Sequence, residues 1–226
     1  MRVGSMALVF LLGSAAFGAS SIPLPFGSIQ DGISPQWQAQ EFRGTSPTHY
    51  ELVEEEGTLA LQASSQNQAS GLVHEVEIDL ATYPILQWRW KVENIIPDGN
   101  ALTKAGDDYA ARVYVVFPHW FRPNTKSINY IWANHLPQGQ VVPNPFFSNA
   151  RMVAVQSGNQ HAGTWITQCR NVYQDYREIF GSIPPKAGAI ALMTDTDNTG
   201  SQARAWYADI RLLAADSHAD PQEYCP

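Results

Sequence analysis

Several motifs that would reveal chemistry are missing from this sequence. It has no G-x-S-x-G nucleophile elbow, no P-loop and no dinucleotide-binding fingerprint, and its six histidines form no H-x-x-x-H or H-E-x-x-H pattern. Zinc chemistry, nucleotide-driven chemistry and serine-nucleophile chemistry therefore have no motif to support them. Fixed-period repeats and low-complexity linkers are absent too, so no domain boundary is indicated.

Positive charge is scarce. The chain has 14 Lys and Arg residues against 21 Asp and Glu residues, which gives a formal net charge of −7. Its basic residues form no stripe along the sequence. Nucleic acid is therefore not an expected partner.

Cysteine is also rare, with only Cys169 and Cys225 and no C-x-x-C pattern. In an exported protein such a pair can form a disulfide, which would pin the C-terminal tail to the body of the protein. Sequence alone does not say whether the two thiols lie close together, so a disulfide and two separate thiols both remain open.

Long apolar runs are missing outside the N-terminus. Residues 1–18 combine an early cation, Arg2, with a short apolar stretch and small residues, which is the layout of a secretory signal peptide. Cleavage after Ala16 or after Gly18 is compatible with the sequence. We expect an exported protein, periplasmic or secreted, whose mature part (19–226) is one domain without a transmembrane segment, because a bilayer-spanning helix needs about 20 apolar residues.

Apolar and polar residues alternate in many short runs separated by turn residues, which is typical of an all-β protein. The predicted strands are 49–55, 58–63, 71–79, 84–92, 108–117, 127–135, 151–157, 164–172, 188–194 and 203–213. One short helix is predicted near 173–181, ending at Gly181. So many strands in one domain favour a two-sheet antiparallel β-sandwich of jelly-roll type, with a barrel as the alternative. Segments 94–107 and 118–125 are expected to be rim loops.

Alternation also assigns the side chains to faces. In 84–92 the predicted inward set is Leu86, Trp88, Trp90 and Val92, and in 108–117 it is Tyr109, Ala111, Val113, Val115 and Phe117. If these two strands are neighbours, one polar face collects the side chains on their other side, namely Arg89, Lys91, Asp108, Arg112 and Tyr114.

Three blocks, "YPILQWRWKV", "GDDYAARVYVVF" and "MTDTDNTGSQARAWYADI", resemble a family of bacterial exported proteins known as a domain of unknown function. The resemblance extends over roughly 37–212 and implies no activity and no catalytic residues. More distantly, the run "AWYADIRLL" is similar to the last strand of many carbohydrate-binding jelly rolls, which is an analogy of fold.

The polar face suits an anionic sugar, because Arg pairs with carboxylates and aromatic rings stack on pyranoses. The predicted ligand-binding residues are Arg89, Lys91, Arg112, Tyr114, His119 and Trp120. The alternatives are a buried ion-pair network for the charged residues and ordinary packing for His119. Trp120, Phe121, Tyr130 and Trp132 form either a sugar-stacking rim or part of the core.

The segment "DTDNTG" (195–200) matches the first half of a calcium loop, with Asp195, Asp197, Thr199 and Gly200 at positions 1, 3, 5 and 6. The glutamate expected at position 12 is replaced by Trp206. Calcium is a possible cofactor, with Asp195, Asp197, Thr199 and Asp209 as ligands, and Asp107, Asp108 or backbone carbonyls are the other candidates for the missing positions. The alternative is a polar turn closed by hydrogen bonds of its own.

Glu75, Glu77 and Asp79 alternate on one predicted strand, which faintly resembles the catalytic strand of jelly-roll glycoside hydrolases, but the solvated face of an edge strand explains them as well. We therefore expect an exported carbohydrate-binding protein with a polysaccharide or another polar molecule as its partner. The alternatives are a polysaccharide lyase or glycoside hydrolase that acts on an anionic glycan, and an envelope scaffold with a large exposed apolar patch.

Overall fold

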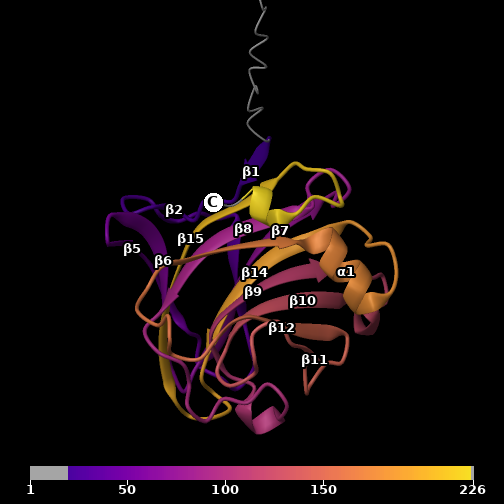
Figure 1. Ribbon diagram of the computed structural model, residues 1–226. Helices are drawn as coiled ribbons and strands as arrows, with labels where there is room; N and C mark the ends of the chain where they lie inside the picture. The colour runs from indigo at the N-terminus through magenta and orange to yellow at the C-terminus, as the bar shows by residue number, and fades with distance from the viewer. Residues whose placement is uncertain (1–19, 225–226) are drawn as a thin grey trace, which may run out of the picture.

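A computed structural model describes residues 20–224, most of which lie in two β-sheets that pack face to face (Figure 1). The first, named here the β8 sheet, contains in spatial order β13 (Ile166–Asn171), β8 (Ile85–Val92), β15 (Gln202–Leu213), β6 (Thr58–Gln66) and β5 (His49–Glu55), with β1 (Ser21–Pro23) also beside β15. The second, the β9 sheet, contains β11 (Val141–Pro143), β12 (Ala150–Ser157), β10 (Lys126–Ala133), β9 (Tyr109–Phe117), β14 (Ala187–Asp195), β7 (Ala69–Ile78) and β4 (Trp37–Glu41).

The predicted fold class is confirmed: the chain forms a two-sheet β-sandwich, not a closed barrel. Every strand predicted from alternation is present, and α1 (Val172–Phe180) begins one residue before the predicted helix. Neighbouring strands are antiparallel except β10 and β12, which run parallel. The pattern missed only short elements, which are β1, β2 (Gly27–Ser28), β3 (Gly32–Ile33), β4, β11 and the 3-10 turns η1 (Lys104–Gly106), η2 (Arg122–Asn124) and η3 (Pro221–Glu223).

Aromatic side chains from both sheets fill the core. Trp88 and Trp90 point inward from β8, and their rings lie 5.3 Å from Tyr130 and 5.8 Å from Trp132 on β10. All four side chains are fully buried. Tyr130 and Trp132 therefore belong to the core and not to a sugar-stacking rim.

Helix α1 lies against one end of the sandwich (Figure 1). The Asn171 side chain accepts a hydrogen bond from the Gln174 backbone N–H, and Gly181 ends the helix in the left-handed conformation, at φ 68°. Tyr176 packs on Phe117 of β9, with 4.5 Å between their ring centroids. No helix in the described part of the chain is both long and apolar enough to cross a membrane.

β8 and β9 are not neighbours, so the condition for one shared polar face is not met: the loop between them carries the chain from one sheet to the other. Since each strand turns its apolar side toward the shared core, their polar sides face solvent in opposite directions. Arg89 and Lys91 lie on the outer face of the β8 sheet, and Arg112 and Tyr114 lie on the outer face of the β9 sheet. The polar face predicted from the sequence is thus split in two.

A β-bulge at the start of β9 reverses the side of the sheet to which the preceding side chains point. Arg112 pairs with Met193 of β14, but Tyr109 pairs with Asp195, so β9 holds one more residue than β14 over this stretch. The bulge turns Tyr109 to the outer face, where it packs with Ile131 and Met152. The prediction that Tyr109 shares the inward face of Val113 is therefore wrong.

Candidate functional site

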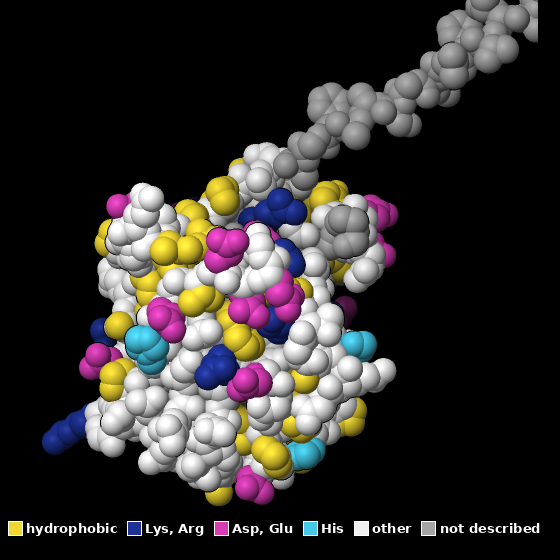
Figure 2. Space-filling view, turned by 90° about the vertical axis from the view of Figure 1, so that its left-hand side faces the viewer, with side chains coloured by type: hydrophobic (Ala, Val, Ile, Leu, Met, Phe, Trp, Pro, Cys, Tyr) yellow, Lys and Arg dark blue, Asp and Glu magenta, His cyan; other side chains and the backbone are white. Residues whose placement is uncertain are grey.

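On the outer face of the β8 sheet the predicted basic residues are paired with acids. Arg89 Nη1 lies 3.1 Å from Asp209 Oδ2, and Lys91 Nζ contacts Glu55 and lies 3.0 Å from Glu56 Oε1. Figure 2, which shows the molecule from the left-hand side of Figure 1, has basic and acidic side chains lying next to one another on this face. The basic residues of this face therefore lie in ion pairs, although not with Asp107 or Asp108. The buried ion-pair network, which is the alternative interpretation of the sequence, is found at Arg112, which pairs with Asp107 and Asp195.

The outer face of the β9 sheet instead carries a cavity of about 790 Å³, which we call the outer-face cavity. Arg112, Tyr114, Asn129 and Met193 contribute to it from three adjacent strands. Both predicted rim loops reach it, 94–107 through Asp107 and 118–125 through Arg122, Pro123 and Thr125. Further lining residues come from Phe42 and from the loop after β11, among them Asn144, Phe146 and Phe147.

The bulge at the start of β9 is held by hydroxyl groups that replace missing ladder hydrogen bonds. Thr194 Oγ1 donates to the Ala110 carbonyl (2.8 Å), and Tyr207 Oη, which reaches across from the β8 sheet, accepts from the Arg112 backbone N–H (3.3 Å). Because these buried backbone groups are satisfied, the irregular backbone is tolerated. As a result Tyr109 and Asp195 come together around Arg112, which lines the cavity.

Arg112 is almost completely buried, yet it is charge-paired. It donates to Asp195, and its Nη1 lies 3.9 Å from Asp107 Oδ2, which also accepts from the Asn144 amide (2.8 Å). Its guanidinium carbon lies 4.8 Å from the centroid of the Tyr109 ring and 5.6 Å from that of Tyr114. Burial raises the pKa of Asp195 and that of Asp107, and the positive charge of Arg112 opposes both shifts.

Two residues that line the cavity each have one buried polar atom without a hydrogen-bond partner in the described part of the chain. Among residues 20–224, neither Arg112 Nε nor Asn129 Oδ1 has a hydrogen-bond partner. One is a donor and the other an acceptor. Both atoms are covered by the protein, so a ligand in the cavity meets the other atoms of these two side chains.

His119 and Trp120 lie beside the cavity and do not line it. They belong to the loop that supplies Arg122, and His119 Nδ1 accepts from the Phe121 backbone N–H (3.0 Å). Trp120 is 90% exposed. Of the six predicted ligand-binding residues, the structure therefore brings only Arg112 and Tyr114 together in one cavity.

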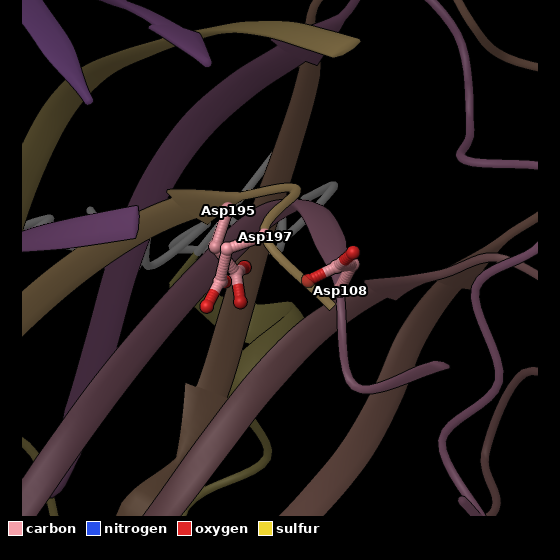
Figure 3. A group of neighbouring side chains, drawn as sticks. All are labelled: Asp108, Asp195 and Asp197. Atoms are coloured by element: carbon pink, nitrogen blue, oxygen red, sulfur yellow. The ribbon is translucent and has the colours of Figure 1, made fainter. Parts of the chain in front are cut away.

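Acidic residues from two segments meet at the predicted calcium loop. Figure 3 shows Asp195 and Asp197, which flank the end of β14, near Asp108, which precedes β9. One ligand oxygen from each lies within 4.8 Å of the others, so this group could hold a metal ion. Asp108 also accepts from Thr199 N and Thr199 Oγ1 (both 2.6 Å) and from Asn198 N (3.2 Å). Burial raises the pKa of Asp197, and the nearby Asp108 adds to this shift.

Asp209 lies elsewhere. It sits at the bulge of β15 with a φ of 53° and pairs with Arg89, so it does not join the other predicted metal ligands. The acidic strand residues are on the surface as well: Glu75 and Glu77 are exposed, and Glu77 pairs with Lys186 (2.7 Å). Asp79 accepts from the Ala81 N–H (2.9 Å), as a turn residue does.

Two sequence predictions fall partly outside the described residues. Cys169 is buried with Ile85 and Leu213, and Tyr224 packs against the same cluster, but Cys225 lies beyond the described range. The expected signal peptide (1–18) lies outside it too. Both remain predictions.

A β-sandwich with a ligand-sized cavity on one outer face is the class of structure defined by these observations. The chain belongs to the family described as "Protein of unknown function (DUF3047)", which matches residues 35–211. This confirms the resemblance seen in the three sequence blocks. No curated protein matches the chain.

Several solved structures are distantly similar. A variant of the carbohydrate-binding module CBM29-2 is 10% identical, with a TM-score of 0.42, covering 90% of this chain and 99% of the module. Another variant, complexed with cellulohexaose, is 8% identical, with a TM-score of 0.40 and coverages of 87% and 94%. The xyloglucanase domain of NopAA from Sinorhizobium fredii, in complex with cellobiose, is 9% identical, with a TM-score of 0.43 and coverages of 88% and 100%. Similarity at this level specifies neither a site nor a ligand.

Proposed function

We propose that this protein binds a saccharide in the outer-face cavity. The observation that carries the proposal is that polar side chains, those of Arg112, Tyr114 and Asn129, line the same cavity as exposed aromatic rings. Phe42, Phe146 and Phe147 all line it and are all exposed.

A sugar ring offers both kinds of complementary surface. Its hydroxyl groups donate and accept hydrogen bonds, and its C–H faces pack against aromatic rings. The volume of about 790 Å³ lies within the usual range of small-molecule sites. Strands of one sheet supply Arg112 and Asn129, so the polar groups are held in place before a ligand arrives.

Calorimetric titration with a panel of neutral and acidic oligosaccharides tests the proposal. Phe147→Ala removes a ring that is 74% exposed, and Asn129→Leu removes the polar atoms at nearly constant volume. We expect each variant to weaken binding by about tenfold or more, which corresponds to about 1.4 kcal/mol. Ile183→Ala is the matched control, because Ile183 is equally exposed (73%) and does not line the cavity.

The outcome that contradicts the proposal is equally specific. Wild-type affinity in both cavity variants would place the ligand elsewhere, and a panel without any binder would exclude a saccharide site. A weakened Ile183→Ala variant would show that the affinity loss reflects general damage to the apolar surface.

We propose binding without turnover as the primary role. A lyase would need Tyr114 as a proton acceptor, but burial raises the pKa of Tyr114, which disfavours its deprotonated form. A hydrolase of the usual kind needs two carboxyl groups, and Asp107 is the one acidic residue in the described lining of the cavity. New reducing ends, or ultraviolet-absorbing unsaturated products, on incubation with the bound saccharide would overturn this part.

The acidic group at the loop 195–200 raises the question of a bound metal ion. Calcium is the ion that best suits the oxygens of Asp108, Asp195 and Asp197, but Arg112 already supplies a positive charge to Asp195, and Asp108 is already hydrogen-bonded. We therefore propose a loop closed by hydrogen bonds.

We also propose export to the periplasm or beyond, supported by the composition of residues 1–18, and N-terminal sequencing of the mature protein tests it.

A further inference from the structure

We infer that the saccharide bound in the outer-face cavity is acidic and carries carboxylate or sulfate groups. This inference rests on the proposed function. It comes from the charge around the cavity: Arg112, Arg122 and Lys126 line it, and Lys104 lies beside its wall, with Nζ 5.3 Å from the Phe146 ring centroid. The whole chain has a formal net charge of −7, so the local sign is reversed.

The basic residues at the rim are not neutralised by the protein. Lys126 Nζ lies 4.6 Å from the Phe180 ring centroid and 3.4 Å from Tyr176 Oη, and neither partner carries a compensating charge. Within residues 20–224, no carboxylate lies in ion-pair distance of Arg122, Lys126 or Lys104. Of these four basic residues, the buried Arg112 alone has acidic partners among the described residues.

On the outer face of the β8 sheet, at the opposite side of the sandwich, several basic residues are paired with acids. There Arg89, Lys91 and Arg204 each lie against a carboxylate, the last at 3.2 Å from Glu93. Other basic residues outside the cavity, such as Arg177 and Arg211, have no carboxylate within ion-pair distance in the described part of the chain, so what distinguishes the cavity is that several such residues lie together around it. A cavity rimmed by unpaired basic residues attracts anions and raises their local concentration.

A saccharide fits these features better than another polyanion does. The positive charge surrounds a cavity and does not form the extended stripe that a nucleic acid backbone needs. Arg122 provides a fork for a carboxylate or sulfate, and Phe146 and Phe147 provide faces for sugar rings. Charge and rings lie on the same cavity, so one ligand can use both.

The test is a calorimetric comparison of matched ligands with the mature protein. Hexuronic acid oligomers with α- and β-linkages are titrated against the same oligomers after reduction of their carboxyl groups, and a sulfated oligosaccharide forms a separate arm. We expect one acidic oligomer to bind at least about tenfold more tightly than its reduced counterpart. The difference should shrink at high salt, because screening weakens exposed charge interactions. The uronate and sulfate arms identify which acidic group is preferred.

Substitutions of the basic residues test whether the preference for the acidic oligomer arises in the outer-face cavity. Arg122→Gln and Lys126→Met should each reduce affinity for the acidic oligomer about fivefold or more and leave affinity for the reduced oligomer unchanged. Arg122 is exposed, so its replacement does not threaten the fold. Arg204→Gln, on the β8 sheet, makes the same change in net charge and should have no effect.

The possible failures are distinguishable. If reduced and acidic oligomers bind equally, or if Arg122→Gln and Lys126→Met keep the wild-type preference, the acidic specificity is wrong and the saccharide site stands. If no saccharide of either kind binds, the proposed function fails and this inference fails with it.

Discussion

Arg112 and Asp195 form a buried pair whose separation we expect to be costly. Arg112 is 4% exposed and Asp195 is 1% exposed, so removal of either side chain leaves the other charge buried without its partner. We predict that Arg112→Met lowers the free energy of unfolding by about 3–5 kcal/mol. The double variant with Asp195→Asn should lose much less than the sum of the single losses, as urea denaturation can measure.

The surface pair Arg89–Asp209 is the control for this prediction. Its side chains are 31% and 56% exposed, so Arg89→Met should cost less than about 1 kcal/mol. Additive losses in the Arg112–Asp195 double variant would mean that the two residues are not coupled.

His74 is predicted to make stability depend on pH. It is buried against Trp37, and burial lowers its pKa from the ordinary value of 6.5. The unfolded chain therefore takes up a proton near pH 6.5 that the folded protein resists. The stabilising contribution is present above this pH and is lost as the pH falls below it.

Urea denaturation midpoints measured between about pH 7.5 and pH 5.5 check the His74 prediction. Relative to His74→Phe, which keeps a ring beside Trp37, the wild-type midpoint should fall as the pH decreases over this range. An identical pH dependence in both proteins would assign the effect to other groups.

At the scale of elements, Asn171 joins α1 to the C-terminal segment. Its Oδ1 caps the helix by accepting from Gln174 N, and its Nδ2 donates to the Ser217 carbonyl (3.1 Å) and the Ala219 carbonyl (2.9 Å). Asn171→Asp keeps the cap and loses both donated hydrogen bonds, at a cost of about 1–3 kcal/mol. We predict faster hydrogen exchange around 217–219 in this variant, with α1 still protected.

Asn171→Ala completes the comparison, because it removes the cap as well and should also speed exchange in the first turn of α1. Unchanged exchange around 217–219 in Asn171→Asp would show that the segment is held by other contacts.

Elements could be predicted from the sequence, but their assignment to sheets could not. Alternation in 84–92 correctly places Trp88 and Trp90 in the core, because a strand in a sandwich has one dry side. Alternation does not say which sheet a strand joins, since a loop can either form a hairpin or cross to the other sheet. It also fails at the bulge of β9, where one extra residue turns Tyr109 to the opposite face.

The whole molecule assembles the candidate site from segments that are distant in sequence. Phe42, Asp107, Asn144 and Met193 all line the outer-face cavity, and no local pattern connects them. The rim-loop prediction for 118–125 did include Arg122, and the sequence did point to Arg112 and Tyr114. The one further signal was the Phe146–Phe147 pair in a loop rich in Pro and Asn, where two adjacent large apolar residues are unusual unless they contact a partner.

A disulfide between Cys169 and Cys225 is predicted to hold the C-terminus against the β8 sheet. Tyr224, the residue before Cys225, packs against the cluster that contains Cys169. Intact mass with and without reduction before alkylation should show one disulfide. Its loss in Cys169→Ser should cost about 2–4 kcal/mol, because the cross-link restricts the unfolded chain. Alkylation of both cysteines in the unreduced, denatured protein would contradict the prediction.

The loop 195–200 links β14 to β15, and so connects the two sheets at one end of the sandwich. If hydrogen bonds to Asp108 close it, neither EDTA nor added calcium should move the thermal midpoint by more than about one degree. Thr199→Val should lower stability by about 1.5–3 kcal/mol, since Thr199 Oγ1 donates to a carboxylate. A midpoint that rises by several degrees with calcium and falls with EDTA would instead show an ion bound by the folded state, because a ligand stabilises the state that binds it. Asp197→Asn separates the two cases, since it weakens an ion site and leaves every hydrogen bond accepted by Asp108 in place.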